Sequence, residues 1–234
     1  LAGVISAQLT SVQLASAQEE QIPDPEFLTL PTKDGLDLRC TYYGGIYKKN
    51  TIPIIIVHEK EGKRTQMDQL ALNLQHAQAD GCGFAVIVPD MRGHGESTLF
   101  ANGKTIKVDK TKPAQFSAMW EDLEAVKKFL LEKNNEGELN IEQLCIIGVG
   151  EMGSMIAWQY TNEDWDFPPL PGIGKQGQDV KALIMISPKI SFKGMTLKVE
   201  GEHAHPLVVS SLSTMIIRGQ RDSDAQKWHD MLKP

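Results

Sequence analysis

The chain has 234 residues, of which 41% are hydrophobic and 23% charged, a balance that suits one globular domain and excludes a disordered or fibrous chain. The formal net charge is -6 and no cluster of Lys and Arg is present, which argues against a nucleic-acid partner. No run of about 18 apolar residues occurs, which argues against a transmembrane segment.

The first residues are similar to the end of a secretory signal peptide. Residues 1–17 are small, apolar and uncharged, and they end in Ala15-Ser16-Ala17. A basic region before them is absent and Gln8 and Gln13 interrupt the apolar run, so a polar tail is the alternative. We expect a signal-peptide remnant and linker over residues 1–26, one domain over residues 27–234, and a secreted or periplasmic location.

Three cysteines, Cys40, Cys82 and Cys145, are an odd number and lie apart from one another and from any histidine. This pattern predicts core thiols rather than a disulfide framework.

The predicted elements begin with an antiparallel hairpin. Segments 27–30 and 36–43 flank the turn signal Lys33-Asp34-Gly35. Later strands are short unbroken apolar runs, which is typical of strands buried on both faces of a parallel sheet. These runs are residues 53–57, 84–88, 144–147, 182–186 and 214–217.

Helices are predicted between these strands, over residues 70–79, 113–133 and 152–160. Residues 99–113 form a polar excursion with a small strand expected at 105–108. Strands that alternate with helices predict an α/β fold with a mostly parallel central sheet and helices on both faces. Ligands of such sheets bind at the carboxyl ends of the strands.

Four segments resemble the α/β-hydrolase family, in the family's order. Residues 88–97, VPDMRGHGES, are similar to its strand-end PDxRGxGxS motif, and residues 55–59, IIVHE, to its strand and HG turn. Residues 148–157, GVGEMGSMIA, resemble its nucleophile elbow, and residues 217–222, IRGQRD, the strand and loop that carry its acid. The resemblance implies an α/β-hydrolase fold over residues 35–228. It also assigns structural roles to His58, Asp90, Arg92, Gly93, His94 and Gly95.

The elbow departs from the family's GxSxG motif, in which a strained strand-to-helix turn exposes a serine. One register places Glu151 at the serine position and Val149 at the first glycine. The other register places Gly150 at the serine position and Met152 at the last glycine. Neither register supplies a hydroxyl. A carboxylate nucleophile is known in the superfamily's epoxide hydrolases and dehalogenases, so Glu151 is either a nucleophile or an acid favoured by the helix N-terminus.

The oxyanion hole and the acid–base pair are altered as well. By position, the backbone N–H donors are those of Met152 and Glu59, and the Glu59 side chain adds negative charge where negative charge develops. Asp222 occupies the acid position, with Asp224 as an alternate. His229 follows Asp222 too closely to match the family's base, so we expect the C-terminal strand and helix of the fold to be missing.

No cofactor or metal is predicted. His203 and His205 alternate as zinc ligands sometimes do, but no further ligands stand at recognisable spacing, so a surface loop is favoured. Gly148, Gly150 and Gly153 match GxGxxG by count alone, without the first-strand position or the following acid.

Few residues separate the elbow helix from the next strand, so no large cap domain is expected. Trp165 and Phe167 lie in that interval and either line a pocket or pack beneath a loop.

Two functions follow from these departures. The first is a secreted α/β-hydrolase-fold protein without the serine triad that acts as a non-catalytic binding or scaffold protein. The alternative is a hydrolase of an ester or other acyl-type bond, with Glu151 as nucleophile, Asp222 as acid and a histidine beyond the chain end. A small-molecule or acyl-type ligand suits either function, and the sequence does not indicate an oligomeric state.

Overall fold

The computed structural model describes residues 21–110, 115–116, 118–167, 175–193, 195–196 and 204–232. The expected signal peptide lies outside these residues, as do the interval 168–174 and His203.

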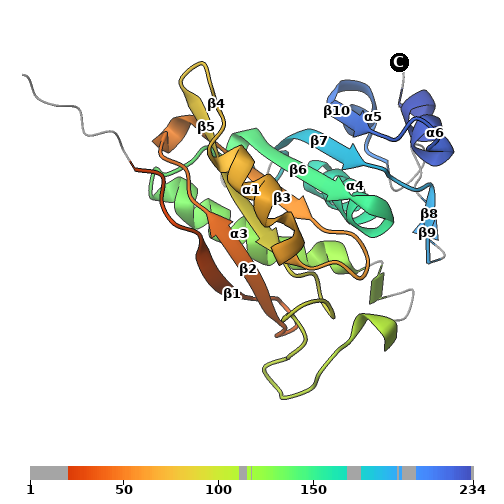
Figure 1. The fold of residues 1–234 in the computed structure, drawn as a ribbon, viewed down its shortest axis with the longest axis horizontal. Coiled ribbons are helices and arrows are strands. Elements are labelled where there is room, and N and C mark those ends of the chain that lie inside the picture. The colour runs from red at the N-terminus through yellow and green to blue at the C-terminus, as the bar shows by residue number, and fades with distance from the viewer. Residues whose placement is uncertain are drawn as a thin grey trace, which may run out of the picture.

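One mixed sheet forms the centre of the molecule, with strand order β1-β2-β5-β3-β6-β7-β10 and β4 paired with β5 (Figure 1). Its strands are β1 (Glu26–Pro31), β2 (Asp37–Tyr43), β3 (Thr51–Val57), β4 (Gln78–Ala79), β5 (Cys82–Pro89), β6 (Leu144–Val149), β7 (Val180–Ile186) and β10 (Ser213–Ile217). Strands β5, β3, β6, β7 and β10 run parallel, whereas β1 and β2 form an antiparallel hairpin at one edge. A separate hairpin joins β8 (Ser191–Phe192) to β9 (Met195–Thr196).

Helices lie on both faces of this sheet (Figure 1). They are α1 (Asp68–Gln75), α3 (Asp122–Asn135), α4 (Gly150–Asp166), α5 (Pro206–Ser211) and α6 (Ser223–Met231). Five 3-10 turns cover residues Lys48–Asn50, Arg64–Met67, Val108–Lys110, Met119–Glu121 and Ile141–Gln143. Helix α1 packs on β5, while α4 packs on β6 and β7 on the opposite face.

Side chains that alternate between the two faces of β3 explain the apolar run over residues 52–57. Ile55 and Val57 face the cluster that α3 and α4 complete, while Ile54 and Ile56 face the α1 side. All four are buried. Each such side chain contributes roughly 1.5–3 kcal/mol to folding through burial, so β3 forms the centre of both cores.

The predicted architecture of a mostly parallel sheet, helices on both faces and an N-terminal antiparallel hairpin is confirmed. No large cap separates α4 from β7, because α4 ends at Asp166 and β7 begins at Val180.

Three predicted elements differ from the structure. The helix predicted over 70–79 ends at Gln75, because Asp80 and Gly81 adopt positive φ and turn residues 78–79 back as β4. The helix predicted over 113–133 is not continuous, since a 3-10 turn at Met119–Glu121 precedes α3. Instead of a strand at 105–108, Thr105 forms an isolated bridge with Leu99.

Candidate functional site

The candidate site lies where three adjacent parallel strands end. Strands β5, β3 and β6 are neighbours in the sheet, so the loops that follow them meet at one edge. The segments after β5 and β3 begin at Asp90 and His58, and β6 leads directly into α4 at Gly150. Ligand sites of open α/β sheets lie at this edge.

The sharp bend after β6 is at Gly150. Val149 is still extended, Gly150 has a φ of +68°, and Glu151 lies in the first turn of α4. A positive φ is costly for a residue with a side chain, and this is the conformation of a strained strand-to-helix turn. The backbone therefore favours the register through Gly150, with Glu151 one residue beyond the bend.

The Glu59 side chain lies over Gly150. A Cβ atom built on Gly150 would stand 2.7 Å from the Cβ of Glu59 and 2.7 Å from its Oε2. A nucleophilic side chain at residue 150 would project into this space, which the Glu59 side chain from the loop after β3 already occupies. Glu59 itself is exposed, whereas Glu151 is partly buried.

Close packing of α4 on the sheet depends on Gly148 and Gly153. A Cβ on Gly153 would clash with the Val57 carbonyl oxygen, and a Cβ on Gly148 would lie 2.5 Å from the Gly153 oxygen. The two glycines let the helix approach β3 and β6 closely. Met152, the predicted oxyanion residue, is fully buried beside them.

His58 and His94 form a buried pair behind this edge, with ring centroids 5.0 Å apart. The Nε2 atom of His58 accepts the Met91 N–H at 3.1 Å, and its Nδ1 lies 2.7 Å from the Glu59 carbonyl oxygen. This pattern requires a neutral ring, and burial lowers the pKa of His58 to about 4. Burial also lowers the pKa of His94. Through these two contacts, the His58 ring joins the loop after β3 to the loop after β5.

Asp90 organises the loop after β5. Its buried carboxylate accepts the N–H groups of Arg64 at 2.7 Å and Glu96 at 3.0 Å, and it pairs with the Arg64 guanidinium. Gly93 and Gly95 form the tight turn that folds over it, both at positive φ.

Arg92 lies in the same loop after β5 and connects it to two other segments. Its guanidinium pairs with buried Asp122 at the start of α3 and, at 3.0 Å, with Asp34 in the β1–β2 turn. These ion pairs fix the loop after β5 to the start of α3 and to the β1–β2 turn.

Among the described residues, no contact links Asp222 to the bend at Gly150. It caps α6, accepting the Ala225 N–H at 3.2 Å, and lies 3.4 Å from the Lys189 ammonium. Although burial opposes the shift, these two donors hold the pKa of Asp222 below its usual value. His229 is exposed on α6, and His205 caps α5.

Two ion-pair centres were missed by sequence reasoning. Arg64 lies in a polar stretch with no signal that it would be buried against Asp90. Likewise, Lys127 on α3 contacts Asp164 at 2.5 Å and Asp179 at 2.9 Å, which ties α3 to α4 and to the start of β7. The pairs are far apart in the sequence, so only the fold reveals them.

Trp165 packs against the start of β7. Its indole N–H donates to the Val180 carbonyl oxygen at 2.9 Å, and the Lys181 ammonium lies 4.8 Å from its ring. The three cysteines are free thiols, and Cys40 and Cys145 are buried.

Within the described ranges, no group of three or more His, Cys, Asp or Glu side chains has the arrangement of a metal site. Among those same residues, no helix is long and apolar enough to cross a bilayer.

No family model and no curated protein matches the chain. Solved structures do match it. A hyperthermophilic esterase from Pyrobaculum calidifontis superposes with a TM-score of 0.60 at 15% identity, covering 91% of this chain and 72% of the esterase. Esterase 2 of Thermogutta terrifontis superposes with a TM-score of 0.55 at 14% identity, covering 84% and 70%.

The chain has an α/β-hydrolase fold. The α/β hydrolase GrgF from Penicillium sp. sh18 agrees with this, with a TM-score of 0.52 and 16% identity over 72% of the chain. The chain spans about half the length of GrgF, covering 47% of it, and likewise 47% of DcsB. Within the α/β-hydrolase fold, the bend at Gly150 follows the central strand β6, where the elbow was expected.

Proposed function

We propose that this protein is a non-hydrolytic binding protein with an α/β-hydrolase fold. At the bend where the family's enzymes carry their nucleophile, this chain has a glycine. One observation carries the proposal: the positive-φ residue at the bend is Gly150, and Glu59 fills the space above it. An acyl group held at this bend meets the Glu59 side chain at the place from which a nucleophile would project. The ligand class is a small neutral molecule, because a second anion beside Glu59 is disfavoured.

Two assays test this proposal, one for ester turnover and one for ligand binding. The purified protein is incubated with an activated short-chain ester and with a fluorophosphonate probe of serine nucleophiles. We expect no burst, no turnover above buffer and no labelled serine. Turnover that disappears on heating, or a probe adduct mapped to one serine, would overturn the proposal.

A positive readout of binding comes from ligand-induced stabilisation. A panel of short neutral esters and amides is screened by thermal unfolding, because a ligand that binds only the native state raises its stability. Hits are repeated in the Glu59→Gln and Glu61→Gln variants. Glu61 is the matched control, since it lies in the same loop but the three atoms nearest to a Cβ on Gly150 all belong to Glu59. We expect the first change to alter the response and the second to leave it unchanged.

The second candidate, hydrolysis with Glu151 as nucleophile, is favoured by its position in the first turn of α4, where the helix dipole stabilises a carboxylate. It is disfavoured by the bend, which lies one residue earlier. The Glu151→Gln variant separates the two. If any ester turnover of the wild-type protein is lost in this variant and retained in Glu59→Gln, the carboxylate mechanism is correct.

We also propose a secreted or periplasmic location, supported by the small apolar residues 1–17 and the sequence Ala15-Ser16-Ala17. Fusion of residues 1–26 to a reporter that is active only after export tests this. Export equal to that of a fusion lacking residues 1–17 would contradict it.

A further inference from the structure

A polar cavity lies beside the loop after β5, on the side of the N-terminal hairpin. Strand β1 is antiparallel to β2, and β2 is antiparallel to β5, so the β1–β2 turn lies at the sheet edge where β5 ends. The cavity measures about 290 Å³ and is lined by Thr32, Lys33, Asp34, Arg92 and Glu121. This volume is close to the lower end for ligand sites, so the cavity fits a small molecule.

Buried groups hold part of this lining rigidly. Arg92 is 9% exposed, and its guanidinium pairs with the fully buried Asp122 at the start of α3. The Thr32 hydroxyl donates to the Asp34 carboxylate at 2.6 Å, and its oxygen accepts the Leu36 N–H at 2.9 Å. Arg92 Nη1 donates to the same Asp34 carboxylate at 3.0 Å. Because these groups are already ordered, a ligand that contacts them causes little further loss of conformational entropy.

Arg92 and Asp34 both keep hydrogen-bonding capacity for a ligand. Arg92 Nε and Nη2 donate to Asp122, and Nη2 and Nη1 donate to Asp34. Among the described residues, one N–H of Nη1 is left without an acceptor. The Asp34 side chain is 47% exposed. Although burial opposes the shift, hydrogen bonds from Thr32 and Arg92 hold the pKa of Asp34 below its usual value, so this carboxylate is ionised at neutral pH.

Lys33 and Glu121 add one charge of each sign to the lining. Both are exposed, and neither forms an ion pair with another described residue. The lining thus carries positive charges on Lys33 and Arg92 and negative charges on Asp34 and Glu121. A simple anion in the cavity would be repelled by the two carboxylates, and a simple cation by the ammonium and the guanidinium. A molecule that carries both signs can pair each of its charges with an opposite one.

We propose that this cavity binds a small zwitterion of the α-amino-acid type. The carboxylate of the ligand accepts hydrogen bonds from Lys33 and from the remaining N–H of Arg92. The ammonium of the ligand donates to Asp34 and Glu121. Hydrogen bonds between charged partners are about twice as strong as those between neutral ones. Because Lys33 and Glu121 are exposed and screened by solvent, we expect a dissociation constant of about 1 mM. The site is separate from the bend at Gly150, whose proposed ligand is neutral.

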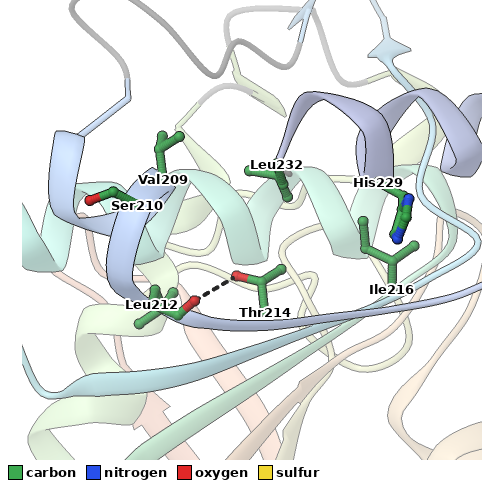
Figure 2. Close-up of a pocket in the computed structure, with 7 residues that line it drawn as sticks. All are labelled: Val209, Ser210, Leu212, Thr214, Ile216, His229 and Leu232. Atoms are coloured by element: carbon green, nitrogen blue, oxygen red, sulfur yellow. Dashed lines mark hydrogen bonds between the residues drawn. The ribbon is translucent and has the colours of Figure 1, made fainter. Parts of the chain in front are cut away.

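A groove elsewhere in the molecule provides an internal control. It lies between β10, α5 and α6 and has a similar volume, about 280 Å³ (Figure 2). Thr214 and Ile216 point into it from the strand, and His229 lines it from α6. No Asp, Glu, Lys or Arg is among its described lining residues. This groove therefore lacks the paired charges that a zwitterion requires, and its backbone amides should not respond to such a ligand.

An NMR titration of the ¹⁵N-labelled full chain tests the need for both ligand charges. The probes are L-serine, ethanolamine, which lacks the carboxylate, and 3-hydroxypropionate, which lacks the ammonium. We expect L-serine to shift the amides of residues 32–35 saturably, and each analogue to bind about tenfold more weakly or worse. The proposal is wrong if L-serine gives no saturable shift up to about 20 mM. It is also wrong if an analogue binds as tightly, or if the amides of the groove in Figure 2 respond equally.

Two variants assign each ligand charge to its partner in the cavity. Lys33→Gln should weaken L-serine and 3-hydroxypropionate about two- to fivefold and leave ethanolamine unchanged, because it removes only the cation. Glu121→Gln should weaken L-serine and ethanolamine to the same extent and leave 3-hydroxypropionate unchanged. The controls are Lys128→Gln on α3 and Glu142→Gln in the 3-10 turn before β6, both exposed and outside the cavity lining. Equal weakening by the controls, or none by either cavity variant, contradicts the proposal.

Discussion

At the residue scale, Gly150 and Glu59 are complementary in shape. The bend gives residue 150 a conformation that glycine tolerates best, and the missing side chain leaves room for the Cβ of Glu59. The Cβ atom is fixed by the backbone, so rotation of the glutamate side chain does not relieve a clash there. The pair therefore excludes a nucleophile in two ways, by conformation and by occupied space.

A double-mutant cycle tests this complementarity. Gly150→Ala is expected to destabilise the protein by about 1–3 kcal/mol through its positive φ, with an added cost from the clash with Glu59. Glu59→Gly alone should have a small effect because the side chain is exposed. In the double variant the steric part disappears, giving a coupling energy of roughly 0.5–3 kcal/mol. Urea unfolding of the four proteins measures it, and strict additivity would show that Glu59 does not occupy the space.

His58 makes the stability of the fold sensitive to acid. Its pKa is about 4 in the folded protein, because the ring is buried, and about 6.5 in the unfolded chain. Between these values the unfolded chain binds more protons, so the free energy of unfolding is highest above about pH 6.5 and falls as the pH drops toward 4. The loss from this residue is about 3 kcal/mol.

Urea unfolding at pH 7 and pH 4.5 checks the direction. The His58→Asn variant should be less stable at pH 7 and lose less stability on acidification than the wild type. Exposed His76 provides the control, and His76→Gln should retain the wild-type pH dependence. An unchanged pH dependence in His58→Asn would show that another group, such as His94, carries the effect.

At the element scale, two buried arginines connect the loops that surround the site. Arg64, before α1, pairs with Asp90 in the loop after β5. Arg92 lies in that same loop and pairs with Asp122 at the start of α3. The loop after β5 is therefore anchored to helices on both faces of the sheet. The rigidity of this loop depends on these two ion pairs. Removing one partner of a pair leaves the charge of the other partner buried.

Removal of the Asp90 carboxylate should cost about 3–5 kcal/mol, because Arg64 is left buried and two N–H groups lose their acceptor. Chemical denaturation of Asp90→Ala measures this cost. Glu96→Ala is the control, since Glu96 pairs with the same arginine at 2.5 Å but its side chain is 67% exposed. Its removal should cost less than about 1 kcal/mol. Equal effects of the two changes would contradict the central position of Asp90.

The strands were predictable from the sequence where burial on both faces imposes a continuous apolar run, as in β3 and β5. The site was predictable only in part. The order of the motifs located the edge of the sheet, but three glycines between 148 and 153 left the bend ambiguous until its φ angles were known. Arg64 and Lys127 were not predictable, because the charges that justify their burial come from distant segments.

At the scale of the whole molecule, the two faces of the sheet are covered unequally. Helix α1 packs against β5 and β2 on one face, whereas Ile184 and Ile186 on that face of β7 are only partly buried. Farther out, Met215 and Ile217 on β10 are exposed. Apolar burial therefore decreases across the sheet from β3 toward β10.

This gradient predicts that the α5–β10–α6 segment opens before the centre of the sheet. Local opening costs less free energy where few apolar groups are buried, so amide hydrogens of β10 should exchange faster than those of β3 and β5 under native conditions. Hydrogen exchange followed by mass spectrometry of peptides over 213–217 and 51–57 gives the comparison. Equal protection of the two peptides would mean that the sheet opens as one unit and that the exposed apolar face has no energetic consequence.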